Sequence, residues 1–433
     1  MIRRTIHEWG RINYGSDISE IPELLADRIV AAARTSSFAG RRKEGVLEHG
    51  RKSLRARGVV GVISVPGCQL EILPKIESDD TEGVSNTALR NRLIHMLAIA
   101  HDLRIDLGDV TQLARQSDTV LEVLIRIFCR KLTDAVRQGM PREYVTDADD
   151  LSAMRGSLDV TRQFSRLAVS PQKLACRFDA LSQDIPLNQV MLAAIRKLSR
   201  VSHASENLRM LRELSFIYAD VTDVPTQALR WDLITLDRTN RRWGDLLSFA
   251  KLFLSDQNQQ TSSGAKSGHA LLFEMNMLFE KYVARLLSSA LTGTGLRVST
   301  QGGYRDCVYD GDRGLFRTRP DLIIRDGKDV ALIIDTKWKR LVPRDLDPKR
   351  DISQADVYQS MAYGYLYDCS NVMLLYPHHS QLSKAESFQS LSIKMAGTPE
   401  KISIATFNLS ASKAEQRQEV KSHVSRTLPE CVE

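Results

Sequence analysis

The sequence predicts an α+β protein of several domains: a small β-rich N-terminal domain, a helical middle domain and a C-terminal α/β domain. Its 433 residues exceed the roughly 100–200 residues of a single domain. Its 42% hydrophobic and 26% charged residues are typical of a globular protein with buried cores. The apolar pattern along the chain places the three domains at residues 1–76, 77–254 and 269–433.

The N-terminal domain is indicated by two short apolar runs. Gly58–Pro66 and Gln69–Lys75 have the length and the β-branched composition of strands, and a Pro-Gly turn joins them. A helix-like run, Glu20–Arg34, precedes both. We therefore expect a β-rich domain that ends near Ile76.

The middle domain is expected to be helical, because apolar residues recur at spacings of three and four within Leu93–Ala100 and again within Val120–Phe128. Residues 255–268 follow and are apolar only at Ala265. Their Gln, Ser and Gly content is that of a flexible linker, so we place a domain boundary there.

The C-terminal domain alternates between helix and strand patterns. The expected elements are a helix from Ala270 to about Ser288, a hairpin over Arg319–Trp338, a helix over Gln354–Tyr367 and a strand over Val372–Tyr376. Such alternation predicts an α/β sandwich.

Charge points to an anionic partner, because the net charge is +7 and the pI is about 9.0. Basic residues gather in a segment, residues 41–57, whose only acidic residues are Glu44 and Glu48. The basic residues of this segment are Arg41, Arg42, Lys43, Arg51, Lys52, Arg55 and Arg57. We expect the segment to contact a partner; a solvated basic face is the alternative.

The six cysteines lie far apart, without C-x-x-C or a histidine pair at zinc-ligand spacing. We therefore expect reduced thiols in a cytoplasmic protein. The first residues lack the apolar core of a signal peptide, and no stretch approaches the ~20 apolar residues that span a bilayer. No membrane association is expected.

The expected hairpin is the most informative segment. Its apolar runs Leu322–Ile324 and Val330–Ile334 are typical of strands buried on both faces. A three-residue loop beginning at Gly327 would place Asp321 directly opposite Asp335, with Cβ atoms about 5 Å apart. Two carboxylates would then converge on one point.

Opposed carboxylates repel each other, so this pair needs a cation or a raised pKa. Because strand side chains alternate, Lys337 shares the face of Asp335, whereas Thr336 points away. Oxygen ligands without Cys or His favour Mg²⁺ or Mn²⁺ over zinc. Such a site can hydrolyse a phosphodiester, with the lysine orienting the nucleophile or stabilising charge. The alternative is an ordinary ion-pair cluster at a strand end.

Flanking helices add further candidates. Glu280 lies one turn from Asn276 on a largely apolar helix and is available as another carboxylate near the metal. Gln359 and Tyr363 are four residues apart on one helix face and could reach the site, although core packing explains Tyr363 equally well. A second Asp-x-Lys, at residues 347–349, contains a proline that a central strand does not accept.

These motifs resemble those of the McrC family, the nuclease subunit of McrBC-type, modification-dependent (type IV) restriction systems. The matching C-terminal phrases are Arg319–Asp321, Ile333–Leu341, Leu278–Glu280 and Asp356–Gln359 with Tyr363. The other matches are Gly61–Ile76 in the N-terminal part, and Met154–Val160 and Cys176–Asn188 in the middle. The resemblance therefore covers most of the chain.

The resemblance implies a PD-(D/E)xK restriction-endonuclease-like fold for the C-terminal domain. Asp321, Asp335 and Lys337 would be its catalytic triad, Glu280 the helix carboxylate, and Gln359 with Tyr363 the trailing Q-x-x-x-Y element. The expected metal ligands are Asp321, Asp335, Glu280 and Thr336. The third position of the PD-(D/E)xK motif is Asp335 here rather than the commoner Glu, so the carboxylate is kept but its reach is shorter.

The function that the resemblance implies is a Mg²⁺-dependent DNA endonuclease. It would act with an McrB-like AAA+ GTPase ring that reads 5-methylcytosine-type modifications and receives the N-terminal domain. The chain has no G-x-x-x-x-G-K-[ST] loop, so nucleotide hydrolysis must come from the partner. The basic segment would serve docking, motor stimulation or DNA contact. The alternatives are a RecB-like DNA repair exonuclease and a catalytically silent regulatory or DNA-binding subunit.

Overall fold

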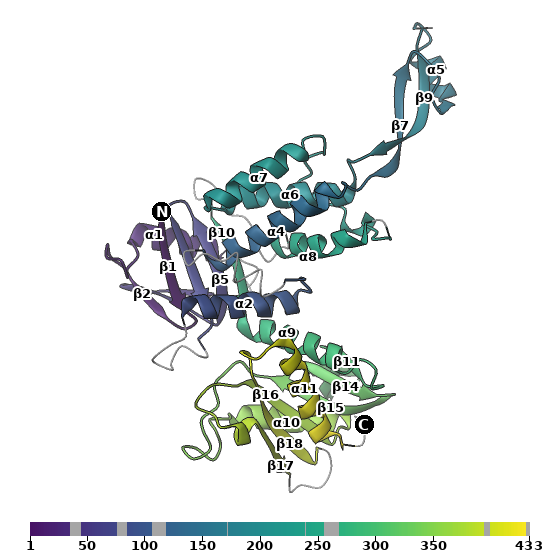
Figure 1. Ribbon diagram of the computed structural model, residues 1–433. Helices are drawn as coiled ribbons and strands as arrows, with labels where there is room; N and C mark the ends of the chain where they lie inside the picture. The colour runs from purple at the N-terminus through teal and green to yellow at the C-terminus, as the bar shows by residue number, and fades with distance from the viewer. Residues whose placement is uncertain are drawn as a thin grey trace. The chain divides into compact units, whose positions relative to one another are not determined.

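The computed structural model describes residues 1–34, 45–75, 85–105, 118–170, 172–238, 240–254, 268–393 and 399–429. The chain divides into two compact units (Figure 1). The first unit combines Met1–Leu121 with Asp256–Glu433, and the second is Glu122–Ser255. Both contain helices and strands, so the architecture is mixed α and β, as the sequence predicts.

A four-stranded sheet forms the N-terminal part of the first unit. Its strands, in spatial order, are β1 (Ile2–His7), β6 (Cys68–Leu73), β5 (Val59–Val65) and β10 (His269–Glu274). The antiparallel β5–β6 hairpin confirms the two strands and the turn expected from the sequence. Helix α1 (Glu23–Arg34) packs its alanines and Ile29 against the sheet, so the helix expected over Glu20–Arg34 is confirmed as well. A small sheet of β2 (Arg11–Asn13), β4 (Ser53–Ala56) and β3 (Leu47–His49) adjoins the same core.

The fourth strand of this sheet comes from the C-terminal part of the chain. We expected a helix to begin at Ala270, but residues 269–274 form β10, which pairs with β5 along its whole length. A short apolar run fits a buried strand as well as a helix, and the open edge of β5 selects the strand here. Gly61 allows the close approach: its φ is +129°, and a Cβ there would lie 2.0 Å from the carbonyl oxygen of Leu271. Helix α9 (Met275–Ala290) begins only afterwards.

The expected boundary at residue 77 does not separate the two units, because helix α2 (Asn86–Ala100) belongs to the first unit and packs on α9. His95 of α2 contacts the Tyr282 ring of α9 at 6.1 Å. Residues 255–267 of the expected linker lie outside the described residues.

Four long helices form the core of the second unit in the part of the chain that the structure describes. They are α4 (Val120–Arg137), α6 (Pro186–Val201), α7 (Ser205–Ile217) and α8 (Gly244–Leu254). Three phenylalanine rings fill the space between α4 and α8, namely Phe128, Phe249 and Phe253, with centroids 5.7–6.2 Å apart. The helical interpretation of the middle of the chain is therefore correct for this core.

The helical pattern expected for the whole middle domain does not hold between α4 and α6, where the chain mainly forms a three-stranded sheet. Its strands are β7 (Glu143–Leu151), β9 (Leu174–Ser182) and β8 (Ser157–Leu158), and the short helix α5 (Val160–Ser165) lies beside them. Figure 1 shows β7 and β9 extending away from the helices of this unit as an arm. The arm leaves large apolar side chains exposed, among them Tyr144, Phe164 and Leu181.

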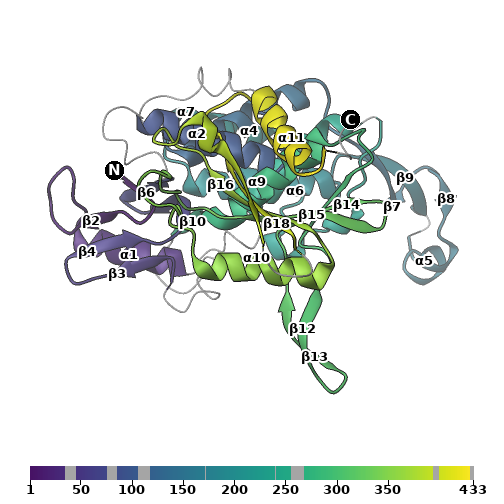
Figure 2. The same ribbon diagram turned by 90° about the horizontal axis from the view of Figure 1, so that it is seen from below.

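The C-terminal part is a six-stranded sheet between two helical layers. Its strands, in spatial order, are β11 (Arg297–Thr300), β14 (Leu322–Asp326), β15 (Asp329–Thr336), β16 (Asn371–Pro377), β18 (Lys401–Phe407) and β17 (Phe388–Ser392). Figure 2 shows α10 (Gln354–Tyr367) on one face and α9 with α11 (Lys413–Thr427) on the other. The α/β sandwich and the helix over Gln354–Tyr367 are thus confirmed. A separate hairpin, β12 (Arg305–Asp310) with β13 (Arg313–Thr318), leads into β14.

Five of the six cysteines lie in the described residues, and all five are free, as expected. Among the helices described here, none is long and apolar enough to cross a membrane.

We predict that Gly61→Ala lowers the free energy of unfolding by at least about 2 kcal/mol, because the new methyl group would collide with the β10 backbone. Gly327→Ala is the matched control: Gly327 also has a positive φ, +56°, but nothing lies within 4 Å of the position of its Cβ. The free energy of unfolding of the control should fall by only about 1 kcal/mol. Urea unfolding measures both, and equal losses would contradict the close approach of β5 and β10.

Candidate active site

The β14–β15 hairpin brings the two expected aspartates together. Its antiparallel register pairs Leu322 with Ile334 and Ile323 with Ile333, and continuing it sets Asp321 opposite Asp335. The turn differs from our expectation, since Gly327 and Lys328 alone connect the strands. A register shift after Ile324 keeps Asp321 opposite Asp335 although the loop is shorter than expected. The expected pairing at the site is therefore correct although the expected loop is wrong.

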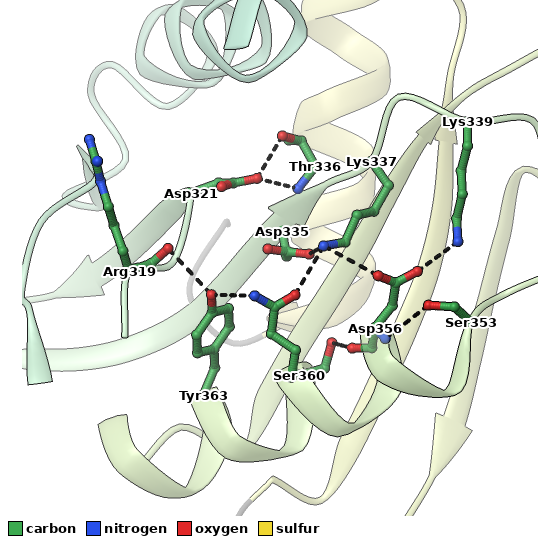
Figure 3. Close-up of polar contacts among 11 residues, drawn as sticks. Arg319, Asp321, Asp335, Thr336, Lys337, Lys339, Ser353, Asp356, Ser360 and Tyr363 are labelled. Carbon is green, nitrogen blue, oxygen red and sulfur yellow. Dashed lines mark hydrogen bonds and ion pairs between the residues drawn. The ribbon is translucent and has the colours of Figure 1, made fainter. Parts of the chain in front are cut away.

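Asp335 and Lys337 form a buried ion pair. The Lys337 Nζ lies 2.6 Å from Oδ2 of Asp335, whose residue is only 3% exposed (Figure 3). Burial, and then the negative charge of Asp321, raises the pKa of Asp335 to about 6. Burial opposes the charge of Lys337, but the charge of Asp335 and its hydrogen bond raise the lysine pKa above its usual range. The lysine therefore stays an ammonium ion.

Asp321 is held by Thr336. Its Oδ2 accepts hydrogen bonds from the backbone N–H and the hydroxyl of Thr336, both at 2.8 Å (Figure 3). We had expected the Thr336 side chain to point away from the site, and that expectation is wrong. Asp321 lies in a bend just before β14, so strand alternation does not govern its side chain, which reaches Thr336 at the end of β15.

Glu280 joins the group from α9. It is 9% exposed, and its Oε1 accepts a hydrogen bond from Nε2 of Gln301 at 2.8 Å. The backbone N–H of Gln301 in turn donates to the carbonyl oxygen of Asp321 at 3.0 Å. Burial, and then the charge of Asp321, raises the pKa of Glu280 to about 7. The structure therefore places all three expected carboxylates in one electrostatic neighbourhood.

Gln359 and Tyr363 connect α10 to the hairpin. Oε1 of Gln359 accepts a hydrogen bond from Lys337 at 3.0 Å, and its Nε2 donates to the Tyr363 hydroxyl at 2.8 Å. That hydroxyl donates to the carbonyl oxygen of Arg319 at 3.3 Å. Tyr363 also packs in a core cluster with Ile323, so it is both a core residue and part of the site.

Sequence reasoning missed Asp356, on the same helix. Its carboxylate lies 3.4 Å from Nζ of Lys337 and 2.7 Å from Nζ of Lys339 (Figure 3). Burial opposes its charge, yet hydrogen bonds from Lys339 and Ser353 hold the pKa of Asp356 below its usual value. The signal was present, because Asp356 precedes Gln359 by three residues and therefore shares its helix face.

The donor set fits a hard divalent cation. Burial, and then the neighbouring charge of Asp321, raises the pKa of both Asp335 and Glu280, so a bound cation would favour their ionised forms. Within the described ranges, no three His, Cys, Asp or Glu side chains are close enough to hold a metal ion by themselves. Mg²⁺ commonly uses one or two carboxylates and completes its shell with water and substrate phosphate, so two ligands suffice.

The basic segment is only partly described. Arg41, Arg42 and Lys43 lie outside the described residues. Two of the others make intramolecular contacts: Arg57 pairs with Glu48 at 2.9 Å, and Nε of Arg55 donates to the carbonyl oxygen of Trp9 at 3.2 Å. Arg51 and Lys52 are exposed between β3 and β4. These two therefore present the best candidates for an external contact.

Comparisons with known proteins agree with the sequence motifs. The family model for the McrBC 5-methylcytosine restriction system component matches residues 54–377. One similar structure is a half-complex of Thermococcus gammatolerans McrB AAA+ hexamers with bound McrC, with 20% identity and a TM-score of 0.67 over 97% of this chain and 99% of that chain. Another is the Thermococcus gammatolerans McrBC complex, with 24% identity and a TM-score of 0.52 over 70% and 89%. No curated protein matches.

We predict that Glu280→Gln stabilises the metal-free protein above neutral pH. The raised pKa means that protonated Glu280 favours folding below about pH 4.5 and that this contribution is lost as pH rises to about 7. Gln retains the acceptor for Gln301 but cannot ionise. Urea unfolding with a chelator measures the difference in free energy of unfolding between the variant and the unsubstituted protein. This difference should rise in favour of the variant by on the order of 2 kcal/mol between pH 5 and pH 8. Glu400→Gln, at an exposed position, is the control, and a pH-independent difference would contradict the assigned burial cost.

Proposed function

The chain belongs to the family of McrBC 5-methylcytosine restriction system components, and from this premise we propose that it is the DNA-cutting subunit of such a system. The observation that carries the proposal is the convergence of Asp321 and Asp335 on one hairpin end, with Lys337 bound to the second carboxylate. Opposed carboxylates followed by a lysine are the expected core of a PD-(D/E)xK restriction-endonuclease-like site. We propose that the C-terminal sandwich has this fold.

The residues of the site divide the work of phosphodiester hydrolysis. Mg²⁺ or Mn²⁺ bound at Asp321 and Asp335, with Glu280 nearby, would supply a Lewis acid for the phosphate and lower the pKa of water. Lys337, fixed by Gln359 and kept charged by Asp335, would orient the attacking water or stabilise charge on the phosphate.

In this proposal, two of the expected site residues orient other residues and do not themselves bind metal or substrate. Thr336, which we expected to be a metal ligand, already donates its hydroxyl to Asp321, so its proposed part is to orient that carboxylate. Tyr363 orients Gln359 and the chain at Arg319 rather than meeting substrate itself.

The proposed partner is an McrB-like AAA+ ring that hydrolyses GTP and reads the modified cytosine. The chain itself has no phosphate loop, so motor activity requires another protein. We propose docking through residues 1–76, with Arg51 and Lys52 in contact with the ring or with DNA. Tyr144 and Leu181, exposed and paired across the β7–β9 arm, form a second candidate contact surface.

We predict that Asp335→Asn and Lys337→Ala each reduce cleavage at least about 100-fold, because they remove a metal ligand and the charged group beside it. Lys349→Ala is the matched control, since Lys349 ends the other Asp-x-Lys tripeptide and is exposed. The assay uses the complete complex with GTP and Mg²⁺ on a circular plasmid carrying methylated cytosine.

Different results of this assay separate the competing functions. Cutting only after the plasmid is linearised would indicate a RecB-like exonuclease. No cutting by the unsubstituted complex, with partner GTP hydrolysis still stimulated, would indicate a regulatory subunit. Full activity of the Lys337→Ala variant would rule out the proposed active site.

We predict that the double variant Arg51→Glu/Lys52→Glu weakens binding to the partner ring or to DNA at least about 10-fold at low salt. The loss should shrink as salt rises, because screening reduces the contribution of exposed charge. Lys384→Glu/Lys413→Glu, a double reversal at exposed positions of the C-terminal part, is the control. Binding constants unchanged at low salt would identify the segment as a solvated face.

A further inference from the structure

A tryptophan links the candidate lysine to the N-terminal sheet. Trp338 directly follows Lys337, and its Nε1–H donates a hydrogen bond to Oε2 of Glu8 at 2.8 Å. Glu8 immediately follows β1 and is only 2% exposed, and its backbone N–H donates to the carbonyl oxygen of Leu73. A glutamate is rarely so buried without a specific contact, and a hydrogen bond to a carboxylate is stronger than one between neutral groups.

The same indole also touches the residue beside the helix carboxylate. Its ring centroid lies 5.4 Å from that of Phe279, at an interplanar angle of 57°. Phe279 is fully buried and directly precedes Glu280. A displacement of Trp338 would therefore disturb two parts of the site at once, the lysine that follows β15 and the glutamate on α9.

A second connection runs through the backbone. β10 is a strand of the N-terminal sheet, and α9 begins at the next residue, Met275. The N–H of Met275 donates to the carbonyl oxygen of Gly58, which precedes β5. The start of the helix that carries Glu280 is thus fixed to the sheet independently of Glu8.

From these contacts we infer that Glu8 is a positioning residue for DNA cleavage, acting through Trp338 on Lys337 and Glu280, and that the N-terminal sheet is a structural part of the cutting site. The inference rests on the proposed nuclease function. Loss of a residue that orients a catalytic group typically lowers activity about 10–100-fold, and displacement of a catalytic group by ~1 Å can lower the rate about 100-fold.

The test uses the full-length chain in its complete complex and compares Glu8→Ala, Glu8→Gln and Trp338→Phe. Gln keeps an oxygen that accepts from the indole, whereas Ala and Phe each remove one end of the hydrogen bond. We expect Glu8→Ala and Trp338→Phe to lower kcat on modified plasmid at least about 10-fold, with KM changed less than about 2-fold. Glu8→Gln should restore kcat to within about 3-fold. Glu23→Ala, at an exposed glutamate of α1, should match the unsubstituted protein.

A readout that does not depend on cutting accompanies the kinetics. The chain has four tryptophans, and the indole N–H signal of Trp338 can be assigned in ¹⁵N-labelled protein by its loss in Trp338→Phe. It should be protected from hydrogen exchange in the unsubstituted protein and in Glu8→Gln, and exchange fast in Glu8→Ala. A Glu8→Ala protein that loses this protection yet cuts at the unsubstituted rate overturns the inference. Should Glu8→Ala not fold, an unchanged kcat in folded Trp338→Phe overturns it equally. Failure of the unsubstituted complex to cut modified DNA counts against the nuclease function instead.

Discussion

The closeness of the Asp321, Asp335 and Glu280 carboxylates, the last two of them buried, is the constraint to which the C-terminal part of the chain responds. Two of these groups have pKa values raised to about 6 and about 7, so ionising them together is costly without a cation. The apolar strands β14 and β15 nevertheless hold them close, because their burial fixes the register. Packing energy from the sheet thus maintains an arrangement that electrostatics alone would disperse.

Helix α10 shows how a single helix face can organise such a site. Asp356, Gln359 and Tyr363 follow one another at spacings of three and four residues. The first two contact Lys337, and Tyr363 contacts the backbone at Arg319. Behind them, Tyr363 and Tyr367 pack on Ile323 and Ile333. The packing that seats the helix on the sheet is therefore also what fixes the lysine, so a core substitution beneath α10 is expected to act on chemistry as well as on stability.

Strong local patterns made much of this predictable from the sequence. The β5–β6 hairpin, α10 and the Asp321–Asp335 pairing follow from apolar runs, turn residues and helical spacing. The identity of β10 did not follow, because its apolar run suits either a helix or a strand, and its partner β5 lies far away in the sequence. The β7–β9 arm was missed for a different reason. β7 is exposed along most of its length, so it lacks the alternation of buried and exposed residues that identifies a strand. The Thr336 contact required knowing that Asp321 precedes its strand instead of lying within it.

β10 is synthesised about 200 residues after its partner β5, which has a consequence for folding on the ribosome. β5 is buried along its whole length in the finished protein, but its outer edge stays unpaired until residues 269–274 have been made. An unpaired apolar strand edge is a site for aggregation, and a nascent chain is exposed to this hazard while the whole second unit is translated. A messenger truncated before that point would yield an N-terminal fragment with an incomplete sheet, a substrate for proteases and chaperones.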